Sequence, residues 1–375
     1  MENIQMVDLK GQYDKIKQEI LQEIDKVLES TAFIQGPEVS AFAEELARWN
    51  EVNHVIPCAN GTDALQIAMM ALGLKPGDEV IVPAFTYVAT AEVIGLLNLV
   101  PVLVPVDSKT FNIDPEYLSK ALSPKTKAIV PVHLYGQCAD MEPILEFAEA
   151  HQLFVIEDNA QGIGARYTFS NGVSKFSGTM GHIGCTSFFP SKNLGCYGDG
   201  GALMTNDDIL AKKIRMIANH GQEKKYYHQL LGVNSRLDTL QAAILRVKLR
   251  HLNEYIAARQ KAASIYDSLF SDIAQIQIPY RAPYSTHVFH QYTLQVSEEK
   301  RNALKTFLEQ KKIPTMIYYP VPLQEQEAFK NICRLGAPLD ICNKLCISVI
   351  SIPMHTELTL ETQNYISETL HDFFQ

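Results

Sequence analysis

The chain has 375 residues, of which 46% are hydrophobic and 20% are charged, and its formal net charge at pH 7 is −9. This length allows a large core and favours two domains, and the composition is that of an ordinary globular protein. The acidic balance, without a long cluster of lysine or arginine, argues against nucleic-acid binding.

Cysteine usage and the N-terminus indicate a reducing, cytoplasmic location. The seven cysteines are an odd number without the spacing of a disulfide framework. Cys342 and Cys346 are one helical turn apart, but without a nearby His or Cys partner we expect them in a core, and we predict no metal site. The first residues lack the apolar region of a secretion signal, and no segment approaches the roughly 18 apolar residues of a membrane span.

The first fifty residues contain two predicted helices. Ile16, Ile20 and Ile24 recur at helical spacing and predict an amphipathic helix over residues 13–29. A second helix is expected over residues 38–49.

Short apolar runs alternate with helix-like segments in the next hundred residues. Buried strands separated by helices are typical of an α/β fold, with a large, mostly parallel sheet and helices on both faces. In such folds ligands bind beyond the carboxyl ends of the strands, so the residues that follow each run are candidates for the site. The runs are Val80–Pro83, Val102–Val106, Ala128–Val132 and Phe154–Ile156, the helical segments lie near 63–73, 87–97, 115–122 and 142–151, and the residues that follow the runs are Thr86, Tyr87, His133, Asp158 and Gln161.

The C-terminal third has a different pattern. A long helix is predicted over residues 237–269, and a mixture of strand-like and helical segments follows it. We therefore expect a large domain over residues 1–250 and a smaller α+β domain over 251–375, with the N-terminal helix able to pack on the small domain. The later segments are Tyr292–Val296, 301–311, the pair Tyr318 and Tyr319, and 360–374.

Lys192 lies in a glycine-rich turn that follows a predicted strand, Ile183–Phe189. Pro190 ends the strand, and the glycines beyond it suit positive φ or close approach to a ligand. A lysine held in such a turn can be desolvated, which lowers its pKa and lets the amine attack a carbonyl. The alternative is an ordinary solvated lysine, and the local pattern does not decide between the two.

A second candidate is a phosphate site at the start of a helix. The sequence Asn60-Gly61-Thr62-Asp63 turns sharply and opens an amphipathic segment, where free amides and the Thr62 hydroxyl can bind an anion. Ser187, just before the lysine turn, can add a second hydroxyl. The alternatives are a plain N-cap by Thr62 or Asp63, and a polar residue that merely ends a strand.

Glu157 and Asp158 close an apolar run, where we do not expect both carboxylates to point into the core. One of them should face the site and can pair with a protonated ring nitrogen, although Asp158 can instead cap the next turn. Tyr87 is placed to lay its ring on a flat ligand or to pack in the core. Together with Lys192 and the phosphate site, these residues describe a site for pyridoxal phosphate (PLP), a cofactor that acts as an electron sink.

Over nearly its whole length the sequence resembles the DegT/DnrJ family of PLP-dependent nucleotide-sugar aminotransferases. The resemblance implies the fold-type-I aminotransferase architecture. It also implies transamination, because sugar dehydratases of this fold carry histidine in place of Lys192. The motifs that carry the resemblance are VDLKGQY (7–13), FIQGPEV (33–39), NGTDALQ (60–66), PGDEVIVPAFTYVAT (76–90), LYGQCAD (134–140), IEDNAQGIGARY (156–167), TSFFPSKNLGCYGDGGA (186–202), NHGQ (219–222), GVNSRLDTLQAAIL (232–245) and SIPMH (351–355).

The resemblance assigns roles to matching positions. Lys192 would form an imine with the cofactor, and Asp158 would pair with its pyridine nitrogen. Asn234 would reach the phosphate in the other subunit's site, which implies a homodimer with shared active sites. Asn159 stands where the family usually has Ala or Ser, a minor departure. The remaining cofactor contacts would be Gly61, Thr62 and Ser187 at the phosphate, Gln161 near the 3-hydroxyl, and Tyr87 stacked on the ring.

The motifs most resemble those of 3-aminotransferases that act on UDP-2-acetamido-3-keto sugars, notably the 3-oxo-glucuronate enzymes. This implies amino transfer from L-glutamate to C3 of such a sugar for surface polysaccharide or lipopolysaccharide synthesis. Arg236 would suit a carboxylate of the uronate or of glutamate through a bidentate fork. Tyr318 stands where we expect histidine in the uronate enzymes, and with Tyr319 it would contact the substrate. The neutral UDP-3-keto-N-acetylglucosamine therefore stays open.

Two other functions are compatible with the resemblance. One is a 4-aminotransferase of a UDP- or dTDP-linked 4-keto-6-deoxy sugar. The other is a non-catalytic regulator of the same fold, against which the acidic charge and the absence of an added DNA-binding domain argue.

Overall fold

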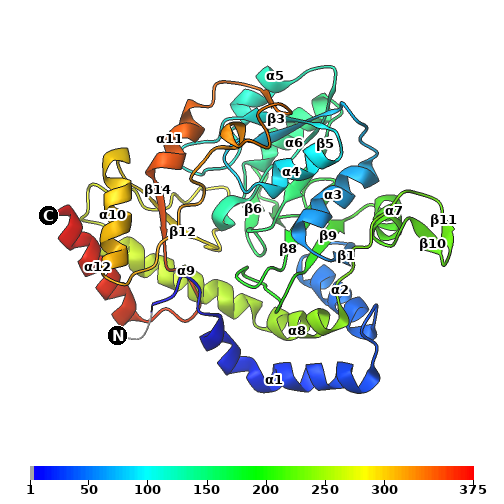
Figure 1. The fold of residues 1–375 in the computed structure, drawn as a ribbon, viewed down its shortest axis with the longest axis horizontal. Coiled ribbons are helices and arrows are strands. Elements are labelled where there is room, and N and C mark those ends of the chain that lie inside the picture. The colour runs from blue at the N-terminus through cyan, green and yellow to red at the C-terminus, as the bar shows by residue number, and fades with distance from the viewer. Residues whose placement is uncertain (1–3) are drawn as a thin grey trace.

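The structure, a computed structural model, describes residues 4–375 and is built around an eight-stranded sheet (Figure 1). The strand order is β1-β9-β8-β5-β4-β2-β3-β13. Strands β8 to β13 in this order run parallel, while β9 is antiparallel to both β8 and β1, so the predicted α/β class with a mostly parallel sheet is confirmed. The strands are β1 (His54–Cys58), β2 (Glu79–Pro83), β3 (Val100–Val104), β4 (Thr126–Ile129), β5 (Phe154–Asp158), β8 (Ile183–Ser187), β9 (Gly201–Thr205) and β13 (Arg334–Leu335).

Helices cover both faces of this sheet because its central strands alternate apolar side chains between the two faces. In β2, Val80 and Val82 belong to a core that includes α3, α4 and α7, whereas Ile81 faces a second core with α5 and α6. Near β1 and β9 the second face is covered by α2 and α8, which pack around Met204. The helices are α2 (Pro37–Trp49), α3 (Gly61–Leu72), α4 (Ala89–Leu96), α5 (Leu118–Ala121), α6 (Met141–Ala150), α7 (Asp208–Ala218) and α8 (Thr239–Arg250).

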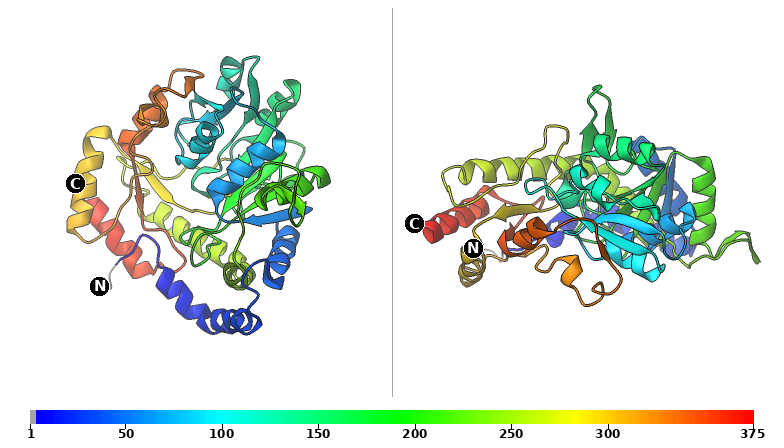
Figure 2. Two further views of the ribbon diagram at one scale, coloured as in Figure 1. Left: turned by 45° about the vertical axis from the view of Figure 1, so that its right-hand side comes forward. Right: turned by 90° about the horizontal axis from the view of Figure 1, so that it is seen from above.

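A separate apolar cluster lies in the C-terminal part, where Tyr266, Tyr292, Ile350 and Ile366 are fully buried. In both views these elements gather at the end of the molecule opposite the projecting β10–β11 hairpin (Figures 1 and 2). The elements that build the cluster are α9 (Leu252–Leu269), β12 (Tyr292–Gln295), α10 (Glu298–Gln310), β14 (Val349–Ile352) and α12 (Leu360–Phe374), and the hairpin strands are β10 (Gln222–Lys224) and β11 (Tyr227–His228).

The segment between α10 and β14 returns to the large sheet. Strand β13 pairs with β3 at the sheet edge, where Arg334 lies opposite Val102. The following helix, α11 (Asp340–Ser348), buries Cys342 and Cys346 in the core of α3 and α4, as expected for core cysteines. The division into two domains at residue 250 stays a prediction, because residues on its C-terminal side contribute to both cores.

Helix α1 (Leu9–Ser30) lies along the outer face of α8 (Figure 1). Ile16 and Ile20 pack against Ile244 and Val247 of α8. Near its start, α1 reaches the C-terminal part through an ion pair between Lys15 and Glu357.

The prediction of one long helix over residues 237–269 is wrong in one respect, because the helix is interrupted at His251, between α8 and α9. Within residues 4–375, no helix has the length and apolar character needed to cross a membrane. The remaining elements are short: β6 (Arg166–Thr168), β7 (Ser174–Phe176) and the 3-10 turns Pro115–Tyr117, Leu134–Gly136 and Leu323–Glu325.

Candidate active site

Asp158 is the last residue of β5 and is 5% exposed. Its Oδ2 accepts a hydrogen bond from the Thr90 hydroxyl at 2.8 Å, and its Oδ1 accepts one from the Ala160 amide at 3.1 Å. Burial raises the pKa of the Asp158 carboxyl, whereas these two bonds and the nearby Lys192 lower it. Each carboxylate oxygen can accept two hydrogen bonds, so Asp158 has capacity for a further cationic donor.

Lys192 lies in the turn after β8, where its amide bonds the Phe189 carbonyl at 2.8 Å. The next residue, Asn193, donates from its side chain to the Val288 carbonyl at 3.0 Å and so ties the turn to the segment before β12. Burial lowers the pKa of the Lys192 amine to about 8, against the opposing effect of Asp158. About a tenth of this amine is therefore neutral and nucleophilic at pH 7, far more than for an ordinary lysine.

The start of α3 and the end of β8, where the sequence predicts an anion site, lie side by side. A Cβ placed on Gly61 would lie 2.7 Å from the Ser187 Cβ, so only glycine lets the helix start approach this serine so closely. The N-cap of α3 is Asn60, whose side chain accepts from the Asp63 amide at 2.8 Å. The alternative of an N-cap by Thr62 or Asp63 is therefore wrong. Ser187 accepts from the Phe189 amide at 3.3 Å, which leaves its hydroxyl proton free to donate.

Four tyrosines and Gln161 lie together near Asp158. Gln161 accepts from the Tyr135 amide at 2.8 Å and donates to the Tyr319 hydroxyl at 3.1 Å. The Tyr319 ring lies 6.0 Å from that of Tyr87, and the Tyr135 hydroxyl donates to the Tyr318 carbonyl. Tyr87 is 56% exposed, so its ring is free to cover a flat ligand rather than packed in the core.

Asn234 and Arg236 lie elsewhere in the chain. Asn234 is exposed and pairs with Asn219 through a backbone bridge. Arg236 lines a groove of about 1400 Å³ between α2, β1 and α7. Ser235, between them, accepts from the Ala59 amide at 3.0 Å, which fixes this segment near the start of α3. Among residues 4–375, no hydrogen bond joins Asn234 or Arg236 to Lys192.

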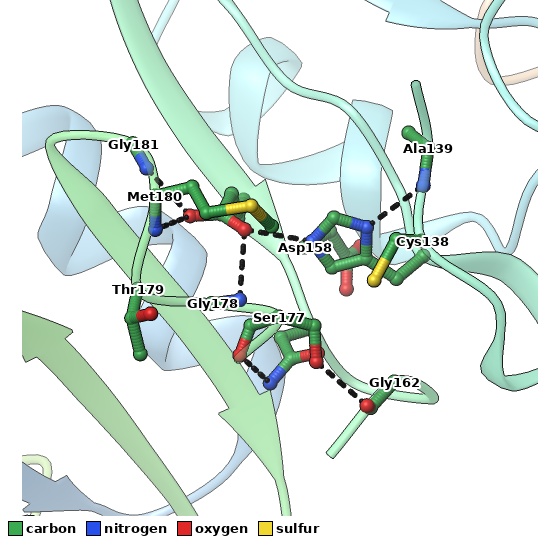
Figure 3. Close-up of polar contacts among 12 residues, drawn as sticks. Cys138, Ala139, Asp158, Gly162, Ser177, Gly178, Thr179, Met180 and Gly181 are labelled. Carbon is green, nitrogen blue, oxygen red and sulfur yellow. Dashed lines mark hydrogen bonds and ion pairs between the residues drawn. The ribbon is translucent and has the colours of Figure 1, made fainter. Parts of the chain in front are cut away.

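Glu157 and Asp158 are both buried. Glu157 points to the opposite side of β5 from Asp158 and is 0% exposed. Its carboxylate accepts from the amides of Gly178, Met180 and Gly181 at 2.6–2.7 Å (Figure 3). The buried negative charge is tolerated because backbone amides donate hydrogen bonds to both carboxylate oxygens.

His133 completes this network. Its Nδ1 accepts from the Ala139 amide at 3.1 Å, so the ring proton is on Nε2, which donates to Glu157 at 2.8 Å (Figure 3). The backbone amide of His133 in turn donates to the Asp158 carbonyl at 3.0 Å. The network therefore supports the end of β5 from behind the site.

Asn159, the departure from the family pattern, is also fully buried. Its side-chain nitrogen donates to the Ser177 carbonyl at 3.1 Å. A Cβ on Gly162 would lie 2.5 Å from its Oδ1, and one on Gly178 would lie 2.8 Å from its Nδ2. Glycine at both neighbouring positions leaves room for the larger side chain.

Comparison with known proteins gives the family. The model of the DegT/DnrJ/EryC1/StrS aminotransferase family matches residues 14–371. The chain belongs to this family. It is therefore an aminotransferase, and its cofactor is PLP.

Three curated relatives match almost end to end. A UDP-2-acetamido-2-deoxy-3-oxo-D-glucuronate aminotransferase of Pseudomonas aeruginosa is 48% identical over 95% of this chain and 96% of its own length. A pleiotropic regulatory protein of Geobacillus stearothermophilus is 46% identical over 100% of this chain and 99% of its own. A UDP-N-acetyl-3-dehydro-alpha-D-glucosamine 3-aminotransferase of Acidithiobacillus ferrooxidans is 43% identical over 98% of both chains.

Two solved structures are similar to this chain in fold along most of its length. DesV of S. venezuelae, in complex with a ketimine intermediate, superposes with a TM-score of 0.95 at 36% identity, over 100% of this chain and 99% of that one. NtdA of Bacillus subtilis, with bound cofactor PMP, has a TM-score of 0.88 at 32% identity and covers 96% of this chain and 82% of that one.

The residues present fit the PLP cofactor. Asp158 retains acceptor capacity for a protonated ring nitrogen, and Lys192 has an amine that is easily deprotonated. The Gly61–Ser187 contact leaves no room for a larger side chain where a phosphate would meet free amides. All these groups lie at the carboxyl ends of β5 and β8 or at the start of α3.

Proposed function

We propose that this aminotransferase moves the amino group of L-glutamate to C3 of a UDP-linked 2-acetamido-3-keto sugar, with the 3-oxo-glucuronate as the preferred acceptor. The similarity to the P. aeruginosa enzyme, 48% identical over 95% of this chain, carries the proposal. Glutamate leaves as 2-oxoglutarate, and the sugar ketone becomes an amine. In this proposal the enzyme works in the cytoplasm, and its product enters surface polysaccharide or lipopolysaccharide synthesis.

Lys192 and Asp158 carry the chemistry in this proposal. When bound, PLP supplies an electron sink for the carbon that bears the transferred nitrogen. Lys192 attaches the cofactor and then, as a free amine with a lowered pKa, takes and returns the proton of that carbon. Asp158 provides a buried negative partner for a protonated ring nitrogen.

The other site residues hold and orient the cofactor. Gly61, Thr62 and Ser187 receive its phosphate at the start of α3, and Tyr87 covers its ring. Gln161 approaches its hydroxyl, in a position fixed by the bonds to Tyr135 and Tyr319.

The substrate contacts in this proposal require a second copy of the chain. Among residues 4–375, no hydrogen bond joins Asn234 or Arg236 to Lys192 or Asp158, and a homodimer in which each copy completes the other's site would supply these contacts. Arg236 would then meet the carboxylate at C6 of the uronate, while Tyr318 and Tyr319 line the other side. The 43% identity to the A. ferrooxidans enzyme keeps the neutral 3-keto sugar as the competing acceptor.

Amination of three candidate sugars tests the proposal. Holoenzyme is incubated with nitrogen-labelled L-glutamate and either the UDP-3-keto uronate, the neutral UDP-3-keto sugar or a dTDP-4-keto-6-deoxy sugar, and the products are read by mass spectrometry. We expect the label in the 3-keto uronate product. Label only in the 4-keto product would show that the site of amination is wrong.

Variants of the groove identify the carboxylate contact. Arg236→Ala should cripple turnover of the uronate and leave the reaction with glutamate alone little changed. Arg48→Ala serves as the matched control, because Arg48 lines the same groove and is exposed. Equal loss in both half-reactions of Arg236→Ala would assign Arg236 to the donor carboxylate instead.

A regulatory role is a second candidate, because the G. stearothermophilus relative, 46% identical, is named a pleiotropic regulatory protein. Such a role makes no demand on the amine of Lys192. In cells that depend on the protein, a regulator would tolerate Lys192→Ala, whereas an aminotransferase would not.

A further inference from the structure

Thr90 directly contacts the carboxylate of Asp158, although 68 residues separate them in the sequence. Thr90 is the second residue of α4 and is 0% exposed. An ionised carboxylate only accepts hydrogen bonds, so the single hydroxyl proton of Thr90 is donated to Asp158 Oδ2, at 2.8 Å. The Thr86 hydroxyl, 3.3 Å from that of Thr90, can then only donate to it, which gives the chain Thr86 to Thr90 to Asp158.

This bond opposes the effect of burial. Asp158 is 5% exposed, and only two donors, Thr90 and the Ala160 amide, hydrogen-bond its carboxylate among the described residues. A buried carboxylate favours its protonated form unless donors or a cation stabilise the charge. Loss of one of two donors from such a group should therefore change its ionisation measurably.

Among the groups that face Asp158 from the neighbouring elements, Thr90 is the side chain that hydrogen-bonds its carboxylate. The titratable groups whose charges act on Asp158, or are acted on by it, are Lys192 after β8, His133 after β4, Cys185 in β8 and Tyr319 in the 317–320 segment. His133 donates its ring proton to Glu157, and the Tyr319 hydroxyl accepts from Gln161. Neither ring is bonded to Asp158, and Lys192 is needed for the cofactor.

Thr90 also joins two parts of the site. The segment between β2 and α4 carries Tyr87 three residues before Thr90, while Asp158 ends β5. The bond from Thr90 therefore links the loop that presents the aromatic ring to the strand that presents the carboxylate. It also fixes which lone pairs of Asp158 remain free.

We propose that Thr90 is a positioning residue for transamination, whose hydroxyl keeps the Asp158 carboxylate ionised and directs its free lone pairs toward the cofactor site. The inference rests on the proposed role of Asp158 toward the cofactor. It does not depend on which sugar is aminated. The hydroxyl of Thr90 hydrogen-bonds Asp158 and Thr86, and it acts in this proposal through Asp158.

Three variants separate the hydroxyl from the packing of the side chain. Thr90→Val keeps the shape and removes the hydroxyl, Thr90→Ser keeps the hydroxyl and removes a methyl group, and Thr86→Val removes only the outer donor. The holoenzymes are compared by the pH dependence of the glutamate half-reaction, by the absorbance spectrum of the bound cofactor, and by carbon NMR of the Asp158 carboxyl, assigned with Asp158→Asn.

Thr90→Val should raise the Asp158 titration, and with it the acid limb of the half-reaction, by about one pH unit or more, because a hydrogen bond to a charged group is lost. The sign follows because a higher pKa of Asp158 means that the negative partner is lost at a higher pH. The rate at pH values below the wild-type acid limb should fall about tenfold and recover at higher pH. Thr90→Ser should stay within about twofold of wild type, and Thr86→Val should shift the acid limb less than Thr90→Val does.

Two outcomes would overturn the inference. One is a Thr90→Val enzyme that is slower but has the wild-type acid limb and carboxyl titration. The other is a Thr90→Ser enzyme as impaired as Thr90→Val, which would assign the effect to the methyl group. If Thr90→Val does not fold, Thr90→Ser and Thr90→Ala give the same comparison. Failure of every keto sugar as an acceptor would refute the proposed function but leave this test intact, because the glutamate half-reaction needs no sugar.

Discussion

Glu157 and His133 form a fully buried pair, with 2.8 Å between the carboxylate and Nε2 of the ring. Because three backbone amides also donate to Glu157, the pair holds the turn at residues 178–181 and the segment after β4 against the end of β5. The strand end that presents Asp158 is thus fixed from the side opposite the cofactor.

We predict that Glu157→Gln destabilises the protein by about 3 kcal/mol, because an amide cannot accept four hydrogen bonds and its NH₂ would face other donors. The midpoint temperature of thermal unfolding should fall by about 5 °C for a chain of this size. The exposed Glu146→Gln, on α6, is the matched control and should change the free energy of unfolding by less than about 0.5 kcal/mol. Equal unfolding temperatures for the two variants would show that the buried network contributes little.

Lysine labelling tests whether a lowered pKa is enough to make the cofactor site. Burial lowers the pKa of both Lys192 and Lys248 to about 8. Lys248 lies under the Tyr197 ring, 5.3 Å from its centre, away from Asp158. We expect as-purified protein to be yellow and borohydride to fix the cofactor on Lys192 alone, as mapped by peptide mass spectrometry. A label on Lys248, or none, would contradict the assignment.

Asp158→Asn should keep the fold and lower the transamination rate at least about a hundredfold, because the ring nitrogen loses its charged partner. Steady-state kinetics at saturating cofactor measure this loss. A near wild-type rate would mean that Asp158 only caps the turn to Ala160.

Asp158→Asn should also change how the free energy of unfolding depends on pH. Because burial raises the folded-state pKa of Asp158 above its ordinary value of 3.8, the folded protein binds more protons there than the unfolded chain does. This contribution to stability is fully present below that value and is lost as the pH rises through the folded-state pKa. Asp158→Asn should lack it, so the wild type should lose stability relative to the variant over that window in urea titrations. Parallel curves would show that the pKa is not raised.

The chemistry at strand ends was predictable from the sequence, whereas its support was not. Asp158 and Gln161 follow apolar runs, so the rule for parallel sheets selects them without coordinates. Lys192 is marked instead by the glycine-rich turn in which it lies. Thr90 looks like any polar residue in a helix, and its contact with Asp158 depends on how β2 and β5 are spaced across the sheet. Burial of Glu157 was missed for the same reason, since its amide partners come from residues 178–181.

Secondary structure was missed where the local signal was weak. Strand β1 reads HVIPC, with a histidine and a proline in five residues, because it is a sheet edge that pairs on one side only. Helix α7 was also missed, although it has an N-cap, Asp207, which accepts hydrogen bonds from the Ile209 and Leu210 amides. The break at His251 leaves the apolar spacing on both sides unchanged, so periodicity alone could not find it.

Subunit exchange tests the shared site. Lys192→Ala chains and chains with an inactivating Asn234 substitution are each inactive, but a mixed dimer has one site with both residues intact. Random exchange should restore about a quarter of wild-type activity, because half of the dimers are mixed and each has one working site. No recovery, with mixed dimers verified by mass, would place Asn234 in its own chain's site.

The ratio of kcat/KM for the UDP-3-keto uronate to that for the neutral UDP-3-keto-N-acetylglucosamine tests the proposed function most directly. A desolvated arginine that meets the C6 carboxylate gains a charge-assisted contact that a hydroxymethyl group cannot offer, a difference of about 2–5 kcal/mol. We predict that wild-type enzyme, with L-glutamate as donor, prefers the uronate at least about thirtyfold. Equal values for the two sugars, or turnover of neither, would contradict the proposal.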